Sequence, residues 1–329
     1  MRYNRPTMIN PHWQQFLESQ NARIDGTTVQ DFGNLNDELQ AALHANWLAD
    51  LSHFSTIKIN GDKTLEFLQG QLTCDVKELK ERQATLAACC NPKGRIIANF
   101  YMWREQNDYY LLLPQAMVTP TIEHLKKYAI FSKVAVAASA DNLIVSGVAG
   151  ELSKEQKNCA TTILIPNPQS LLPTTHLIIA DPETMISLWK NAQPHTTPIG
   201  ALAWHAFNIK NGLSFIYPPT RELFTPQMIN LQKLGGVSFS KGCYVGQEII
   251  ARTEHLGKLK RHLYHAHSDS DAPPQPGDEL KNTAAQTVGI VVAAAPAQNS
   301  GFELLAVMQD QMLQQDNNIF YKNVNKLVF

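Results

Sequence analysis

The sequence has no CxxC pair, no long apolar run and no excess of charge, and each absence excludes a class of protein. Its five cysteines are Cys74, Cys89, Cys90, Cys159 and Cys243. Without a second nearby thiolate, the chain alone is a poor candidate for a zinc or iron–sulfur site, and no stably bound metal is expected. An odd number of scattered cysteines is typical of a reducing compartment, which predicts the cytoplasm. No apolar stretch has membrane-spanning length, and the first residues lack the apolar core of a signal peptide.

The balance of charge argues against a protein whose whole surface binds nucleic acid. Lys and Arg number 28 against 29 Asp and Glu, which leaves a net charge of -1. A local basic patch follows Arg252, at Lys258, Lys260 and Arg261. Such a patch is either a solvated helix end or a surface for an anionic ligand or RNA, and both alternatives stay open.

Common catalytic motifs are also missing from the sequence. It contains no Walker A motif, no GxGxxG behind a strand and no HExxH. His265 and His267 would share one face of a strand, but a third metal ligand is missing there. We therefore expect two surface histidines on a strand rather than a metal site.

The pattern of apolar and turn residues predicts an α+β protein of several domains. Residues 1–45 are polar and weakly patterned, which indicates an irregular arm with a short helix. Residues 46–150 and 151–257 each mix helices with strands joined by hairpins, and 258–329 form short strands typical of a small β-barrel. A proline-rich segment, residues 268–280, is interpreted as a linker.

Local signals place several element ends. The residues Asn91–Gly94 include asparagine, proline and glycine, which favour turns, and they predict a hairpin. Asp62, Thr119 and Asp181 are expected as helix N-caps, with Pro120 and Pro182 at the first helical positions.

The stretch "SFSKGCYVGQEIIAR", residues 238–252, carries the most specific signal. Cys243 lies beside Lys241 and shortly before a predicted helix, where the cation and the helix dipole would favour its thiolate. The alternative is a buried cysteine that acts as a small hydrophobe in a tight loop. The residues alone leave these two interpretations equal. The motif residues expected to support Cys243 are Lys241, Gly242, Tyr244, Gly246, Gln247, Glu248 and Arg252.

The octamer "KGCYVGQE" resembles the signature of the YgfZ folate-binding proteins, which are relatives of the glycine cleavage T-protein, an aminomethyltransferase. The segments "LQGQLTCDV", "NPKGRIIANF" and "LKKYAIFSKV" are similar to that family as well and follow in the same order. The resemblance covers nearly the whole chain. It implies a three-domain cloverleaf of the aminomethyltransferase folate-binding type, ending in a small β-barrel.

The resemblance also implies a tetrahydrofolate site. The family carries two tryptophans associated with folate, and the second matches Trp204. The first falls on Phe54, which keeps an aromatic face but lacks the indole N–H. Trp204 is expected to stack on a folate ring, and the alternative is a large core residue.

The comparison with the transferase removes one activity. T-proteins carry an acidic pair where this sequence has Ala98 and Asn99, and a glutamate at the end of the central helix where it has Lys210. Neither Ala98 nor Asn99 can act as a carboxylate, so glycine-cleavage aminomethyl transfer is not expected. Lys210 only donates hydrogen bonds and would not accept from a pterin edge.

The resemblance implies a role in maintaining iron–sulfur enzymes, among them the enzyme that methylthiolates tRNA. Cys243 would serve as a transient ligand, a redox thiol or an acceptor of a one-carbon unit, and the sequence does not choose among these. The alternatives are a folate-dependent methyl- or aminomethyltransferase with rearranged chemistry, and a module that contacts tRNA directly through Lys258, Lys260 and Arg261.

Overall fold

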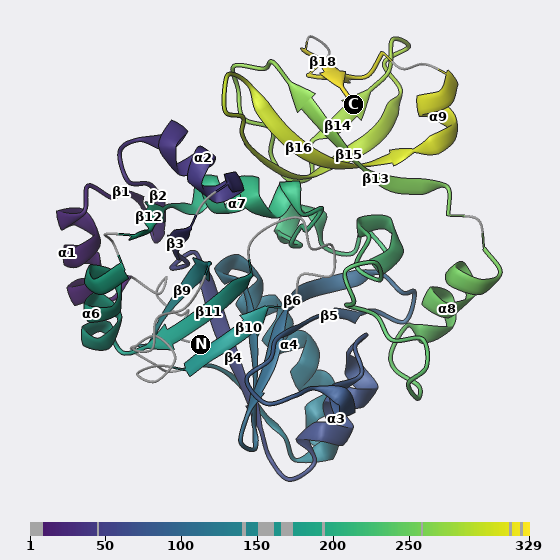
Figure 1. The fold of residues 1–329 in the computed structure, drawn as a ribbon. Helices are drawn as coiled ribbons and strands as arrows, with labels where there is room; N and C mark the ends of the chain where they lie inside the picture. Colours follow the sequence, from purple (N-terminus) through teal and green to yellow (C-terminus); the bar gives the residue numbers. More distant parts are fainter. Residues whose placement is uncertain are drawn as a thin grey trace. The chain divides into compact units, whose positions relative to one another are not determined.

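The computed structural model describes residues 9–44, 46–139, 143–150, 161–165, 174–192, 195–257, 259–315, 318–322 and 325–329 (Figure 1). The chain divides into two compact units, and each is built from two separate segments. Unit 1 comprises residues 1–54 and 140–207, and unit 2 comprises residues 55–139 and 208–329. The four-part division expected from the sequence stays a prediction.

Unit 1 is built on a five-stranded sheet. Its strands, in spatial order, are β10 (Thr161–Ile165), β11 (Thr175–Ala180), β9 (Ile144–Ala149), β3 (Trp47–Asp50) and β12 (Thr197–Ile199). Neighbouring strands are antiparallel except for β12, which runs parallel to β3. The other elements are α1 (Pro11–Ser19), the hairpin β1 (Arg23–Asp25) and β2 (Thr28–Asp31), α2 (Leu35–His44), α6 (Pro182–Ala192) and the start of α7 (Ala201–Lys210).

The N-terminal segment contains the predicted short helix, but it is more ordered than the irregular arm predicted around it, because it also forms β1, β2 and α2. Helix α1 buries Trp13, Phe16 and Leu17 on one face. The indole Nε1 of Trp13 donates to Asp50 Oδ1 at 2.8 Å, and its ring meets Trp189 of α6 edge to face at 5.2 Å. Few but regularly spaced apolar residues are enough to make this helix part of the core.

A buried carboxyl group fixes the start of α7. Glu38 of α2 accepts hydrogen bonds from the amides of Phe32 and Gly200. Burial raises the pKa of Glu38 to about 7, against the two amides, which lower it. A Cβ at Gly200 would lie 2.4 Å from the carbonyl oxygen of Gln30, so only glycine fits where α7 begins.

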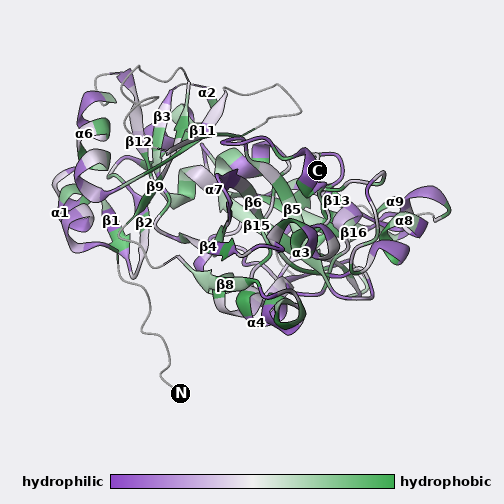
Figure 2. Ribbon diagram, turned by 90° about the horizontal axis from the view of Figure 1, so that it is seen from below, coloured by the Kyte–Doolittle hydropathy of each residue, from purple (hydrophilic) through white to green (hydrophobic). Residues whose placement is uncertain are grey.

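Unit 2 contains a second five-stranded sheet and several helices. The sheet order is β5 (Thr85–Cys90), β6 (Ile96–Glu105), β7 (Asp108–Pro114), β4 (Phe54–Asn60) and β8 (Ala135–Ala138). The helices are α3 (Thr64–Gln71), α4 (Val118–Ala129) and α8 (Gln247–His255), with short 3-10 turns η1 (Val76–Glu78), η2 (Gln115–Met117), η3 (Ile130–Ser132), η5 (Pro218–Thr220) and η6 (Pro226–Ile229). Figure 2 shows hydrophilic and hydrophobic residues together on α4, which packs against β8.

The structure confirms one of the three predicted helix caps. Asp181 accepts from the amide of Thr184 at 3.0 Å at the start of α6. The predicted caps of α3 and α4 are wrong. Helix α3 begins after Lys63 rather than after Asp62, and α4 begins after Met117 rather than after Thr119. Neither Lys63 nor Met117 makes a side-chain cap hydrogen bond. No polar side chain at the cap position therefore fixes where these two helices begin.

The C-terminal strands of unit 2 form a closed barrel, as expected. Its order is β13 (Arg261–Ser268), β16 (Phe302–Gln309), β15 (Thr287–Pro296), β14 (Glu279–Lys281), β17 (Phe320–Tyr321) and β18 (Asn325–Val328), with α9 (Asp310–Gln315) following β16. The proline-rich segment is not a linker between domains, because it connects β13 to β14 within this barrel. Among the residues described above, no helix is both long and apolar enough to cross a membrane.

Two of the three histidines of β13, His265 and His267, were singled out in the sequence, and both pair with carboxylates. His265 Nε2 lies 2.8 Å from Glu303, and His267 lies 2.9 Å from Glu303 and 3.0 Å from Asp269. Hydrogen bonding to Glu303 raises the pKa of His267, which indicates that the pairing favours its protonated form. Over the residues the structure covers, no group of three or more His, Cys, Asp and Glu side chains is arranged to hold a metal ion.

Candidate functional site

Cys243 lies on a loop of unit 2, residues 238–247, which we call the thiol loop. The loop connects η6 with α8, and Cys243 and Gly242 are both exposed on it. The three other cysteines that the structure describes, Cys74, Cys89 and Cys90, are buried. Burial raises the pKa of Cys74 and Cys89 to about 12. Those thiols are small hydrophobes, whereas Cys243 is open to a partner; Cys159 lies outside the described residues.

A buried lysine ties the thiol loop to the segment that follows α3. Lys241 is 7% exposed, and its Nζ donates to the carbonyl oxygens of Leu72 at 2.8 Å and Cys74 at 2.7 Å. Burial lowers the pKa of Lys241 from 10.5 to about 8. The ammonium group of Lys241 is directed at these two carbonyls. That Lys241 also stabilises the thiolate of Cys243 stays a prediction.

Further contacts on either side of Cys243 hold the loop backbone. Tyr244 is buried, and its ring lies 5.0 Å from the Lys241 ammonium. The amide of Val245 donates to the carbonyl oxygen of Gly70 at 3.1 Å, and the amide of Ser238 donates to Thr73 at 2.8 Å. The loop is therefore attached to α3 and to the segment that follows it, while Cys243 points outward.

Gln247 closes the loop across its base. Its Oε1 accepts from the amide of Tyr244 at 3.3 Å, and its Nε2 lies 3.5 Å from the carbonyl oxygen of Lys241. Gly246 has φ +83°, and a Cβ there would lie 2.6 Å from the carbonyl oxygen of Asn91. The conformation and the close approach both require glycine at that position.

Three motif residues have no such role in holding the loop. Glu248 and Arg252 are exposed on α8. Gly242 does not have positive φ, and a Cβ there would meet no atom within 4 Å. Nothing in the described part of the chain requires glycine at Gly242.

The positions expected from the resemblance to match the transferase acids are buried on β6. Ala98 and Asn99 are each 1% exposed. The Nδ2 of Asn99 donates to the carbonyl oxygen of Ser214 at 2.8 Å, and its Oδ1 accepts from the amide of Ile216 at 2.8 Å. An amide supplies one donor and one acceptor for these two bonds, which a carboxylate cannot do. Asn99 thus holds the segment after α7 and is not placed to transfer a proton.

In unit 1 the two aromatic residues expected to contact folate are covered by neighbours. Trp204 is 1% exposed and Phe54 is 6% exposed. The Trp204 ring stacks on Phe207 at 5.8 Å and meets Trp47 edge to face at 5.5 Å. The proposed stacking of a folate ring on Trp204 stays a prediction, and in this structure its faces pack within the core.

Polar atoms beside these rings nevertheless lack partners. The indole Nε1 atoms of Trp47 and Trp204 and both ring nitrogens of His53 are buried without a hydrogen bond. The rings of His53 and His205 lie 5.3 Å apart, and burial lowers the pKa of His205 to about 4. Unpaired buried groups of this kind are rare in proteins. They fit a ligand that brings hydrogen-bond acceptors, as tetrahydrofolate does. No motif in the sequence singled out Trp47, His53 or His205.

The remaining predicted residues are surface groups. Lys210 is exposed at the end of α7, and Lys260 and Arg261 are exposed before and at the start of β13. Lys258 lies outside the described residues.

Comparisons with known proteins agree with this architecture. The family model of the GCVT N-terminal domain matches residues 2–160. The chain is 32% identical over 281 residues to the tRNA-modifying protein YgfZ of Klebsiella pneumoniae, covering 80% of this chain and 86% of that protein. It is 29% identical over 257 residues to the protein of the same name from Colwellia psychrerythraea, covering 73% of this chain and 78% of that one.

A solved structure shows the fold. The chain superposes on the glycine cleavage aminomethyltransferase T of Bartonella henselae with a TM-score of 0.73, covering 91% of this chain and 89% of the other, at 14% sequence identity. The expected aminomethyltransferase-like α+β fold with a C-terminal barrel is therefore confirmed.

The substitution Lys241→Met should lower the free energy of unfolding by about 1–3 kcal/mol, because two buried carbonyls lose their donor. The folded-state pKa of Lys241, about 8, lies below its ordinary value of 10.5. Wild-type stability should therefore rise between these two pH values, while the variant lacks that rise. Urea unfolding at pH 7 and near pH 9.5 measures both effects. Lys233→Met, at an exposed site, is the control and should stay within about 0.5 kcal/mol. Equal behaviour of the two variants would refute the anchoring role.

Asn99→Asp should destabilise the protein by about 1–3 kcal/mol at neutral pH, because the carboxylate leaves the Ser214 carbonyl without a donor. Burial should raise the pKa of the new carboxyl group. Once protonated, it can again donate to Ser214 and accept from Ile216, so the deficit should shrink as the pH falls. Denaturant titrations over a pH series check this, with the exposed turn variant Asn107→Asp as control. A deficit that does not change with pH would contradict the role of Asn99.

Proposed function

The chain belongs to the family of the tRNA-modifying protein YgfZ, and from this premise we propose that it is a folate-binding accessory protein. It supports the synthesis or repair of iron–sulfur enzymes and, through them, the methylthiolation of tRNA. Its place of action is the cytoplasm. Its partners are folate and iron–sulfur enzymes such as the one that methylthiolates tRNA.

The observation that carries this proposal is the presentation of Cys243. Lys241, Tyr244, Gly246 and Gln247 all hold the thiol loop, and the thiol of Cys243 is exposed between them. A loop that served only packing would turn its thiol inward, as Cys74 and Cys89 are turned. The neighbouring Gly242 would leave room for a partner to approach the thiol. The arrangement suits contact with another macromolecule better than chemistry in an enclosed pocket.

One thiol limits what the chain can do by itself. A cluster needs several thiolate ligands, and Cys243 offers one. A client enzyme would supply the others, so that the cluster is cargo rather than a resident cofactor. Ligation, redox exchange and acceptance of a one-carbon unit each use the same exposed thiolate.

Tetrahydrofolate is the proposed cofactor, and in unit 1 its acceptor atoms would meet the unpaired N–H groups of Trp47 and Trp204. Phe54 would close the apolar side of this site. When bound, the folate supplies a carrier for one-carbon units. The Asn99 amide argues against the alternative transferase role, because it already makes two hydrogen bonds to the backbone.

Cys243→Ala should abolish methylthiolation of tRNA in cells whose own copy of the gene is deleted, while the free energy of unfolding changes by less than about 0.5 kcal/mol. The exposed thiol makes no packing contact that folding needs. Mass spectrometry of the modified nucleosides measures the loss, and denaturant unfolding measures stability. The control Cys89→Ala removes a buried thiol and should lower stability but retain modification. Normal methylthiolation in the Cys243 variant would overturn the proposal.

Trp204→Phe should weaken binding of tetrahydrofolate about tenfold, the equivalent of one lost hydrogen bond of roughly 1.4 kcal/mol. The change keeps an aromatic ring and removes Nε1. Calorimetric titration of the reduced protein measures the affinity. Trp103→Phe is the matched control, because Trp103 is buried in unit 2 and also has an unpaired Nε1. If wild type does not bind, the folate part of the proposal is wrong and the role of Cys243 stands alone.

A further inference from the structure

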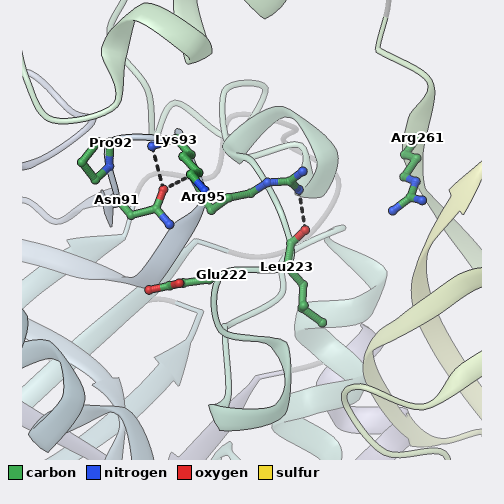
Figure 3. Close-up of a pocket in the computed structure, with 7 residues that line it drawn as sticks. All are labelled: Asn91, Pro92, Lys93, Arg95, Glu222, Leu223 and Arg261. Carbon is green, nitrogen blue, oxygen red and sulfur yellow. Dashed lines mark hydrogen bonds between the residues drawn. The ribbon is translucent and has the colours of Figure 1, made fainter.

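A pocket of about 540 Å³ opens on unit 2 beside the turn between β5 and β6 (Figure 3). Its volume lies within the range of small-molecule sites. The lining residues are Asn91, Pro92, Lys93, Arg95, Glu222, Leu223 and Arg261. Three of them are cationic and one is acidic, so the wall is positive although the chain as a whole has a net charge of -1.

The turn that forms one wall is rigidly built. Asn91 Oδ1 accepts from the amides of Lys93 at 2.9 Å and Arg95 at 3.1 Å. Gly94 has φ +68°, and a Cβ there would lie 3.2 Å from side-chain atoms of Ile249 and Ile250 on α8. The pocket wall is thus packed against the helix that follows the thiol loop.

Arg95 is positioned by a single backbone contact. Its Nη1 donates to the carbonyl oxygen of Leu223 at 2.6 Å and lies 3.8 Å from the sulfur of Met228 (Figure 3). Its other guanidinium N–H groups make no hydrogen bond to the described residues. A guanidinium fixed at one nitrogen and open at the others is suited to bind an oxyanion.

The other charged groups of the pocket are not paired. Lys93, Glu222 and Arg261 are exposed, and none of them forms an ion pair within the described ranges. Glu222 stays unpaired although three cations line the same pocket. The pocket therefore offers donors for an anion and, separately, a carboxylate that can accept from hydroxyl groups.

We propose that this pocket binds a nucleoside phosphate. The phosphate is held by Lys93, Arg95 and Arg261, and Glu222 accepts a hydrogen bond from a ribose hydroxyl. Pro92 and Leu223 supply apolar surface for the sugar or the base. The nucleotide is either free or one unit of an RNA strand. The choice of RNA as the natural source rests on the proposed function. The nucleotide site does not, because it is inferred from the residues that line the pocket.

Titration of the full-length protein at low salt with adenosine 5′-monophosphate and with adenosine tests the site. The nucleotide should bind at least about tenfold more tightly than the nucleoside, because only the nucleotide carries the phosphate. The double variant Lys93→Ala, Arg261→Ala should lose this preference; both side chains lie at the surface, and Arg95 is left in place to hold Leu223. The control Lys126→Ala removes one positive charge from the exposed face of α4 and should bind like wild type.

Equal affinity for nucleotide and nucleoside, or undiminished nucleotide binding by the double variant, would overturn the proposal. A third result would also overturn it: the protein binds folate polyglutamate through Lys93 and Arg261 but does not bind the nucleotide. The natural anion would then be a carboxylate. The variant Glu222→Ala tests the contact with the ribose hydroxyl. Wild type should bind adenosine monophosphate more tightly than its 2′,3′-dideoxy analogue, and the variant should show a smaller difference between the two affinities.

A short single-stranded RNA distinguishes the two sources. If the site takes an RNA strand, the RNA should bind more tightly than the mononucleotide, with a steeper fall of the binding constant with salt. Equal affinity and equal salt dependence identify a free nucleotide. Binding by Cys243→Ala should match wild type, so failure of this site and failure of the thiol-dependent function are observed in separate experiments.

Discussion

The buried ammonium of Lys241 is the interaction on which the arrangement around Cys243 depends. It fills a place where the carbonyls of Leu72 and Cys74 need a donor, and it does so despite a desolvation cost that lowers its pKa to about 8. Lys241 and Tyr244 are both buried, and Cys243 lies exposed between them. Within the octamer, the side chains of Lys241, Tyr244 and Gln247 hold the loop, and the side chain of Cys243 is exposed.

Asn99 shows how the fold of a transferase can persist without its acid–base chemistry. A side chain that must donate to Ser214 and accept from Ile216 has to be an amide, and an ionised acid there would be buried beside a carbonyl. The same position cannot both hold this segment and act as a carboxylate. The two hydrogen bonds of Asn99 thus hold the backbone of this fold, and Cys243 is the exposed thiol among the cysteines that the structure describes.

Sequence reasoning found the features that depend on neighbours in the chain. The turn at Asn91–Gly94 and the cap at Asp181 are local, and the structure has both. The N-terminal segment was misjudged because its average polarity hides the stripe of Trp13, Phe16 and Leu17. The anchoring of Lys241 could not be found, because its carbonyl partners lie 169 and 167 residues away and a backbone acceptor leaves no trace in the sequence. The pocket could not be found either, because Lys93 and Arg261 are far apart in the sequence and line one pocket only in the fold.

The turn at Asn91–Gly94 joins the two features that distinguish this surface. The carbonyl oxygen of Asn91 requires glycine at Gly246 in the thiol loop, and the side chains of Lys93 and the adjacent Arg95 line the pocket. The backbone of this turn also packs against α8 through Gly94. A ligand bound by Lys93 and Arg95 would therefore contact the same turn that holds the thiol loop at Gly246. Because the chain has almost no net charge, its overall charge does not attract anions, and attraction has to come from local groups such as this wall. Local attraction of this kind disfavours non-specific binding to nucleic acid and favours a ligand that fits the pocket.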